Sequence, residues 1–387
     1  MRRSKRVAVQ VHLWLGLVVG LLWSLQGLTG ATLVFHRELD RWVHSEWRGG
    51  PGLPLPADQL IAIAEKSSGR PVTALGILDA GRDLRTATYT DASGMQNMLL
   101  LDASSGVIVG QRQPQPVRPS DGSTSRFVYM IHQKLVSGHS GEVVIGLSGC
   151  LLLLTAILGL WIAWPRRGNW RSLIIPRGWR TLSQKLYSWH RLAGLAFGIV
   201  FVFVAIGGIY MTFADPIRKG LGEVIDLQSP YEPAPSTASS QWLAAQTAVN
   251  VAARLFPDAQ FVRLAMPTKD KPVYIVRLRQ PGEVRAWSGA TAVTLDAVKG
   301  DVLQIQDGLR GPLADRILDA QFSIHNGEAA GLLGRLLIML AGLSLPTFYL
   351  TGLWLWFRKR WLRAVKRAQS GQSPRGALMS AMGRKQT

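Results

Sequence analysis

Four long apolar stretches dominate the pattern of hydrophobic and polar positions along the chain. They cover residues 13–35, 143–164, 192–213 and 336–357. Each has the roughly 20 residues that a helix needs to cross the hydrocarbon core of a bilayer. The first follows a basic N-terminus, as a secretory signal does, but its apolar run is about twice as long as a signal core and no Ala-x-Ala-type cleavage site follows. The pattern predicts a membrane protein with four transmembrane helices, the first of which is retained.

Shorter patterns occupy the segment between the first and second stretches and the segment between the third and fourth. The two segments have the same order of predicted elements. In the first, Asp58 is a suitable N-cap for a helix through Lys66. Strands are expected at 86–90, 98–101 and 107–109, and in the second segment a helix at 241–256 is followed by strands at 273–278 and 301–303. An Asp-to-Gly turn precedes the last strand each time, at 102–106 and 296–300, and Pro- and Ser-rich linkers lie at 49–56, 113–125 and 229–240. We expect two small α+β domains.

The apolar stretches also repeat. His12-Leu-Trp-Leu-Gly-Leu opens the first and His190-Arg-Leu-Ala-Gly-Leu opens the third. A shift of 193 residues superposes the ends of the second and fourth stretches and places His132 on His325. The predicted fold is therefore a four-helix membrane bundle made of two repeats of helix, outer domain and helix. Internal duplication of this kind often brackets a site that both halves share.

These patterns predict the following segments. The membrane helices are 13–36, 131–164, 190–214 and 323–357, and the two outer domains are 37–130 and 215–322. The remaining segments are the N-terminus 1–12, the loop 165–189 and the tail 358–387.

The charge distribution predicts the orientation. The net charge is +20, and it equals the basic residues of 1–12, 165–191 and 358–387, which contain no acidic residue. The two outer segments are balanced. Short basic loops stay on the cytoplasmic side of the membrane. We therefore expect a protein of the bacterial inner membrane with both termini in the cytoplasm and both outer domains in the periplasm. This distribution favours a membrane lipid surface over nucleic acid as the partner of the basic segments.

Histidines are the candidate chemistry-bearing residues. Of seven, six lie at or near the ends of the apolar stretches: His12, His36, His132, His139, His190 and His325. An ionisable side chain near the bilayer is costly unless it is paired or bound, which makes a functional role the default hypothesis. An interfacial histidine with no ligand is the alternative for any single one, but duplicated positions weaken that reading.

The duplication predicts two pairs. His12 and His190 would form an inner pair, and His325 would face His132, with His139 second and His36 third as its partner. The inner set offers only two histidines without nearby Cys, Asp or Glu, which are too few for zinc but suffice as the two protein ligands of a haem iron. No Cys-x-x-Cys-His motif is present, so the haems would be two non-covalent, b-type groups.

Other residues around the pairs carry weaker signals. Gly16, Gly20, Gly27, Gly194 and Gly198 could leave room for a flat macrocycle, although small residues equally permit plain helix packing. Arg37, Arg191 and Arg335 are candidates to bind haem propionates, with a topogenic or lipid-phosphate role as an equal alternative for each. The single cysteine, Cys150, is expected to be a small core residue.

The chain resembles the PepSY-associated transmembrane-helix family, and especially the FoxB-type iron-regulated ferric-siderophore reductases. The motifs that carry the resemblance are His12-Leu-Trp-Leu-Gly-Leu, Gln26-Gly-Leu-Thr-Gly30, Ile131-His132-Gln-Lys-Leu, Trp164-Pro-Arg-Arg167, Trp189-His190-Arg191, Ser323-Ile-His325-Asn-Gly327 and Thr351-Gly-Leu-Trp-Leu-Trp356. The resemblance implies PepSY-like periplasmic domains and a haem-dependent inner-membrane enzyme that reduces ferric siderophores.

The expected function is transmembrane electron transfer from an inner to an outer haem and on to a periplasmic ferric siderophore. The sequence has neither G-x-G-x-x-G nor G-x-x-x-x-G-K-S/T, so the donor would be a quinol or another protein. Two alternatives remain open. One is a non-catalytic regulatory or binding membrane protein, and the other is a haem or siderophore permease.

Overall fold

The computed structural model describes residues 3–112, 124–165, 181–228, 231 and 242–369. The chain divides into two compact units. The helical unit comprises Met1–Leu28, Cys150–Val202 and Leu340–Thr387, and the sheet unit comprises Thr29–Gly149 and Phe203–Met339. Most of the linkers 113–125 and 229–240, the core of the basic loop 165–189 and the end of the basic tail lie outside the described residues.

Among the described residues, four helical segments are long and apolar enough to cross a membrane. They are Arg3–Val34, Gly138–Ala163, Leu182–Thr212 and Glu328–Gln369. Three of them correspond to helices α1 (Arg3–Val34), α5 (Gly138–Ala163) and α7 (Leu182–Thr212), and the fourth contains α11 (Gly331–Gln369). Helices α1, α7 and α11 extend beyond the apolar stretches into basic sequence, because Lys and Arg are good helix formers.

Two of the predicted membrane segments are each broken into two helices. The segment 131–164 consists of the end of α4 (Thr124–Lys134) and of α5, and positive φ angles at Leu135 and Val136 separate them. The segment 323–357 contains the end of α10 (Leu313–Asn326), the 3₁₀ turn η3 (Glu328–Ala330) and α11. Gly327 makes this second break at φ 84°, and a Cβ there would lie 2.5 Å from the backbone of Gly334. His132 and His325 therefore lie on short helices that precede the breaks.

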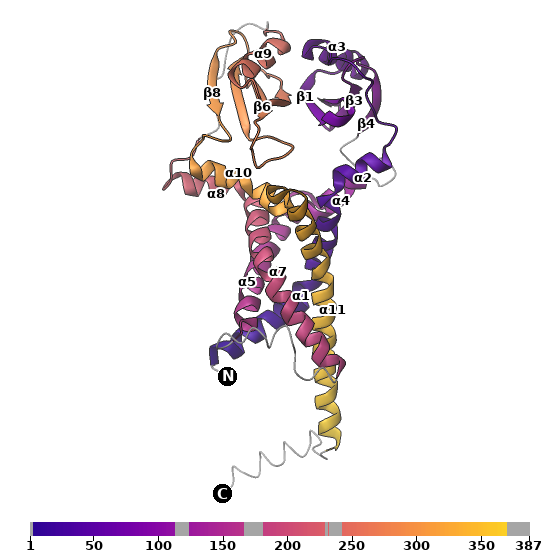
Figure 1. Ribbon diagram of the computed structural model, residues 1–387, viewed down its shortest axis with the longest axis vertical. Helices are drawn as coiled ribbons and strands as arrows, with labels where there is room; N and C mark the ends of the chain where they lie inside the picture. Colours follow the sequence, from indigo (N-terminus) through magenta and orange to yellow (C-terminus); the bar gives the residue numbers. More distant parts are fainter. Residues whose placement is uncertain (1–2, 113–123, 166–180, 229–230, 232–241, 370–387) are drawn as a thin grey trace. The chain divides into compact units, whose positions relative to one another are not determined.

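The sheet unit contains one antiparallel sheet with the strand order β4-β3-β2-β1-β5-β6-β7-β8 (Figure 1). The strands are β1 (Val72–Asp79), β2 (Leu84–Thr90), β3 (Gln96–Asp102), β4 (Ile108–Arg112), β5 (Gln260–Ala265), β6 (Val273–Arg279), β7 (Thr291–Asp296) and β8 (Val302–Gln306). Helix α3 (Ala57–Ser68) precedes the first four strands and α9 (Ala245–Leu255) the last four. The remaining short elements are α2 (His36–Val43), η1 (Ala80–Arg82) and α8 (Ala214–Gly222).

The segments 37–130 and 215–322, expected to form separate domains, contribute strands to the same sheet. Strands β1 and β5 pair in antiparallel fashion, with Leu75 opposite Leu264. Neither strand matches a strand expected from the sequence, and the same is true of β7. In β1, Ala74, Leu75 and Gly76 are all buried, so the strand lacks the alternation by which a half-exposed strand is recognised.

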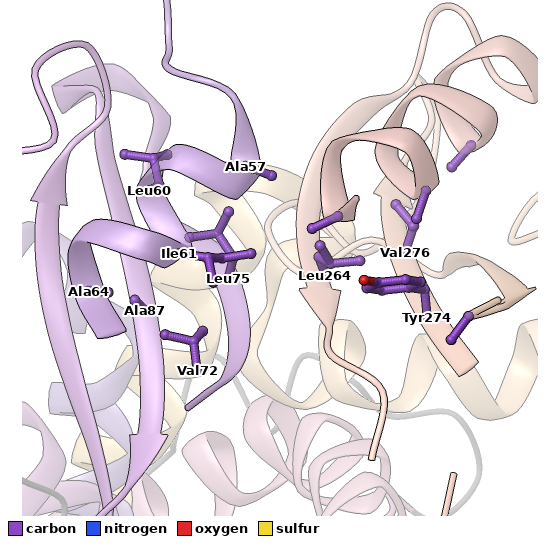
Figure 2. Packing of buried hydrophobic residues seen from close by; sticks show 14 of the residues in the cluster. Ala57, Leu60, Ile61, Ala64, Val72, Leu75, Ala87, Leu264, Tyr274 and Val276 are labelled. Atoms are coloured by element: carbon purple, nitrogen blue, oxygen red, sulfur yellow. The ribbon is translucent and has the colours of Figure 1, made fainter. Parts of the chain in front are cut away.

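The core of the sheet unit lies between the sheet and the two helices α3 and α9. Leu60 and Leu75 are almost fully buried, as are Leu264 and Val276 in the other half. In Figure 2, Ile61 of α3 lies beside Leu75 of β1, and Leu264 of β5 lies beside Val276 of β6. Each fully buried leucine contributes about 1.5–3 kcal/mol through removal of apolar surface from water.

The capping role expected for Asp58 is wrong, because this residue acts across the two halves. The N-cap of α3 is Pro56, which makes no side-chain capping bond. The Asp58 carboxylate instead accepts the backbone N–H groups of Ala245 and Gln246 at the start of α9, at 2.7 and 3.1 Å. In return, the side-chain oxygen of Gln246 accepts the N–H of Ala57 at 2.7 Å. Each half thus supplies the cap of the other half's helix.

Candidate functional site

The helical unit contains a cavity of about 580 Å³ that both inner histidines line. This volume lies in the range of about 300–1,000 Å³ that is typical of ligand and cofactor sites. His12 comes from α1 and His190 from α7, so the expected inner pair does face one space. Most of the wall is apolar, including Trp23, Phe201 and Phe348.

Each inner histidine is held through Nδ1 by a neighbouring helix. Nδ1 of His12 lies 3.0 Å from the carbonyl oxygen of Thr155 on α5. A carbonyl can only accept, so this nitrogen carries the proton, and in the neutral ring Nε2 has the lone pair. Nδ1 of His190 lies 3.1 Å from Oγ1 of Thr351 on α11. That hydroxyl lies 2.7 Å from the Thr347 carbonyl, to which it donates, and it therefore accepts from His190.

The glycines of this cavity fall into two groups. A Cβ on Gly16 or Gly194 would meet nothing within 4 Å, so their backbone borders open space, as a flat macrocycle requires. A Cβ on Gly20 would lie 2.6 Å from Tyr349, and one on Gly198 would lie 2.7 Å from Leu160. Gly27 is not among the residues that line the cavity, and a Cβ there would clash with a backbone oxygen of Gly342 on α11. These last three serve close packing.

The cationic residues near the cavity have different surroundings. Arg191 donates from Nε and Nη2 to the carbonyl of Ala163, at 3.0 and 2.9 Å. This interaction caps the C-terminus of α5, where the helix dipole favours a positive charge. Arg191 also lines the cavity, together with Arg358 and Lys359, two basic residues that the sequence analysis does not single out.

The sheet unit brings the other expected pair together. The ring centroids of His132 and His325 lie 6.2 Å apart, with their planes inclined by 65°. The two imidazoles thus make an edge contact within the sheet unit.

This second pair is held in the same way as the first. Nδ1 of His325 donates to the carbonyl of Val204 on α7 at 2.8 Å. Nδ1 of His132 lies 3.0 Å from the hydroxyl of Thr29 on α1. Ligating histidines characteristically bond their second ring nitrogen to an oxygen, which orients the ring and selects the tautomer.

Each of the four histidines also packs against a glycine. A Cβ on Gly30 would lie 2.9 Å from Cε1 of His132, and one on Gly208 would lie 3.2 Å from Cε1 of His325. The corresponding distances are 3.1 Å from Gly159 to His12 and 3.9 Å from Gly352 to His190. None of these four glycines stands out from the sequence pattern of any one helix. Their signal is the repeat itself, because Gly30 follows His12 by the same 18 residues as Gly208 follows His190.

His139 and His36, the other two candidate partners of His325, lie in different environments from His132. The His139 side chain is 88% exposed and lies 3.9 Å from the Glu142 carboxylate. Nδ1 of His36 donates to the Leu33 carbonyl at 2.7 Å, one turn back along the chain. Burial lowers the pKa of His36, and the adjacent Arg37 acts in the same direction. Of the three contenders, His132 is the one whose ring contacts His325.

The remaining propionate candidates are held by protein groups. Arg335 donates to the Val34 carbonyl at 2.8 Å and to the Glu38 carboxylate at 2.7 Å. The hydrogen bond from Arg335 lowers the pKa of Glu38. The Arg37 guanidinium lies 4.4 Å from the ring centre of Trp287. Arg37 also lines a second cavity, which lies in the sheet unit.

Cys150 is exposed, contrary to the expected core position, because it lies on the surface of an apolar helix. Within the described part of the chain, no group of three or more His, Cys, Asp or Glu residues could hold a metal ion.

Comparison with known proteins identifies the family. No curated protein matches the chain. The family model of the PepSY-associated TM region matches residues 9–359, which contain two of the four candidate membrane helices in full and most of the other two. The protein is therefore a membrane protein that belongs to the PepSY-associated TM region family.

Proposed function

We propose that this protein is a di-haem inner-membrane reductase that moves electrons across the membrane, reduces a ferric siderophore in the periplasm and releases Fe(II). The observation that carries the proposal is the common geometry of His12, His190, His132 and His325. Each is anchored through Nδ1 to an oxygen of another helix, and each packs against a glycine.

The residues present fit non-covalent haems. His12 and His190 would be the ligands at the larger cavity, where Gly16 and Gly194 leave open space. His132 and His325, whose ring centroids lie 6.2 Å apart, would be the ligands of the second group. When bound, each haem would supply a one-electron redox couple. The protein would hold the ligands in place and surround the inner group with apolar side chains.

The charge pattern supports the proposed direction of transfer. The basic segments 1–12, 165–191 and 358–387 would keep both chain ends in the cytoplasm. The first pair would then lie on the cytoplasmic side and the second on the periplasmic side, with the sheet in the periplasm. A quinol or a protein would reduce the inner group. Reduction of the siderophore iron weakens its binding, because ferrous iron binds hard oxygen ligands less tightly than ferric iron.

The absorption spectrum of the purified full-length protein tests the cofactor. We expect a Soret band and, on reduction, the sharp α and β bands of a bis-histidine haem, with two haems per chain. His190→Ala and His325→Ala should each lower this ratio to about one. A colourless preparation would overturn the proposal and leave the regulatory function, which needs no haem.

Anaerobic mixing tests the reductase step. The reduced protein should be reoxidised by a ferric siderophore, with one Fe(II) appearing in a ferrous trap for each electron lost. The redox-inert gallium complex of the same siderophore should leave the haems reduced. Siderophore-iron uptake that persists in the double variant His190→Ala, His325→Ala would instead favour a permease.

A further inference from the structure

Helix α2 exposes its apolar side chains, which reverses the usual arrangement of a surface helix. Leu39, Trp42 and Val43 occupy positions i, i+3 and i+4, so they share one face of the helix. Their exposed fractions are 39%, 80% and 48%. A surface helix of a globular protein turns its apolar face to the core and its charged face to water. The reversed orientation of α2 indicates that the surroundings of this face are apolar.

The charged side chains of α2 contact other parts of the protein. Asp40 pairs with Arg112 of β4 at 2.9 Å. The Arg37 guanidinium lies 4.4 Å from the ring centre of Trp287. These interactions hold α2 by its polar face, and they leave the apolar face directed outwards. The orientation of α2 is therefore set by polar partners within the chain and not by burial of its apolar residues.

Helix α10, in the other half of the sheet unit, has the same reversed orientation. Asp315 is 3% exposed, pairs with Arg218 of α8 and accepts the backbone N–H of Gln228 at 2.9 Å. Leu313 and Ile317 are 69% and 52% exposed. Each lies two residues from Asp315, which turns a helical side chain by about 200°. The two apolar side chains therefore point away from the buried carboxylate.

Helix α8, the counterpart of α2 in the repeat, lacks an exposed apolar face of its own. The shift of 178 residues that relates His12 to His190 places Gly220 of α8 on Trp42. Ile217 and Leu221 of α8 are half-buried. In this half of the sheet unit, α10 thus supplies the apolar face.

Both α2 and α10 are directly continuous with candidate membrane helices. Phe35 alone separates α1 from α2, and Gly327 alone separates α10 from the span Glu328–Gln369. Because a helix rises 1.5 Å per residue, the chain keeps Trp42 within about 12 Å of Phe35. The exposed face of α2 therefore begins where a candidate membrane helix ends.

We infer that the outward faces of α2 and α10 lie in the headgroup region of the membrane that the long helices cross. Trp is enriched at membrane–water interfaces, and Trp42 is the most exposed residue of the α2 face. Interfacial helices bury their apolar faces about 5–10 Å into the boundary between headgroups and acyl chains. A second copy of the chain fits less well. A stable protein interface takes roughly 20–30 residues per side, and these two faces expose five large apolar residues.

Spin-label accessibility in lipid vesicles tests this placement. The full-length protein with Cys150→Ser has no other thiol, so Trp42→Cys or Ile317→Cys then provides a single site for a nitroxide. The protein is reconstituted in vesicles of phosphatidylethanolamine and phosphatidylglycerol, in which dissolved oxygen concentrates in the bilayer while a nickel chelate stays in water. We expect both labels to be more accessible to oxygen than to the chelate.

Leu255→Cys in the same background is the matched control. Leu255 is 43% exposed on α9, a helix that buries Ala245, Ala248 and Ala252 in the ordinary orientation. Its label should be more accessible to the chelate than to oxygen. Leu39→Cys repeats the measurement on the α2 face with the tryptophan ring in place.

Two outcomes would overturn the inference. Labels on α2 or α10 that respond to oxygen and chelate as the Leu255 label does would place that face in water. Low accessibility to both reagents would show that protein covers the face, as in a dimer. The measurements need neither haem nor electron transfer, so their outcome is independent of the reductase proposal.

Discussion

The ring centroids of His132 and His325 lie 6.2 Å apart, and the two ring planes are inclined by 65°. Because His139 is exposed and lies beside Glu142, we expect His132→Ala to lower the haem content from two to about one per chain. His139→Ala should leave it at two. Haem and protein assays on the purified variants measure this ratio, and loss of a haem in His139→Ala alone would reverse the ligand assignment.

Removal of one hydroxyl should affect His190 without touching its ring. Thr351→Val deletes the acceptor of the His190 Nδ1–H, and loss of such a partner typically lowers metal affinity by 10–100-fold. We expect weaker retention of one haem and a shift of its midpoint potential, with recovery in Thr351→Ser. Thr347→Val is the matched control one turn earlier, because its hydroxyl bonds only within α11. Equal effects of both valine variants would contradict the role of Thr351.

Gly159 and Gly352, which match at the shift of 193 residues, should differ in their tolerance of substitution by alanine. A Cβ on Gly159 would lie 3.1 Å from Cε1 of His12, which is tighter than ordinary contact, whereas one on Gly352 would lie 3.9 Å from Cε1 of His190. Gly159→Ala should therefore displace the His12 ring and perturb the spectrum of one haem. Gly352→Ala should leave the spectrum unchanged. The absorption spectra of the two reduced variants make the comparison.

The Asp102 carboxylate should make the stability of the sheet unit depend on pH. Although burial acts to raise its pKa, N–H donors of Gly50 and Ser104 and the hydroxyls of Ser104 and Ser105 hold it well below its ordinary value of 3.8. A group whose pKa is lower in the folded state than in the unfolded state contributes its full stabilisation when the pH is above the unfolded-state pKa. This stabilisation is lost as the pH falls below about 4 toward the folded pKa.

Asp102→Asn tests this dependence. The variant's free energy of unfolding at pH 7 should be lower than that of the wild type by about 1–3 kcal/mol. Between roughly pH 5 and pH 3, its unfolding temperature should fall less than that of the wild type. Asp296 occupies the corresponding turn and accepts the N–H groups of Val298 and Lys299. Asp296→Asn should have the smaller effect. A wild-type acid response in Asp102→Asn would contradict the assignment.

Asp58 should matter for the join between the two halves of the sheet. Asp58→Ala removes the acceptor of two N–H groups at the start of α9, and loss of a helix cap costs about 0.5–2 kcal/mol. We expect a lower unfolding temperature and faster amide exchange in the first turn of α9. Asp91→Ala, at an exposed turn whose bonds stay within residues 91–97, is the control. Exchange that was unchanged at Ala245 and Gln246 would refute the cross-cap.

Sequence alone predicts the family, the four candidate membrane helices and the paired arrangement of the histidines. These features are local, or they recur along the chain. Apolar length, basic flanks and motifs that match at a shift of 193 residues can be read without knowledge of any long-range contact. The same pattern also predicted most of the outer strands, because strands such as β2 and β3 are flanked by clear turn signals.

Only the tertiary structure decided the features that depend on contacts between distant residues. The alternation rule cannot detect β1 and β5, which are central strands, and their pairing makes one sheet of two segments. The choice of His132 over His139 depends on the break after α4, where Leu135 and Val136 adopt positive φ. The partner of Asp58 lies 187 residues away. Such choices arise from packing, which fixes which side chains meet, and no local pattern of hydrophobic and polar residues encodes them.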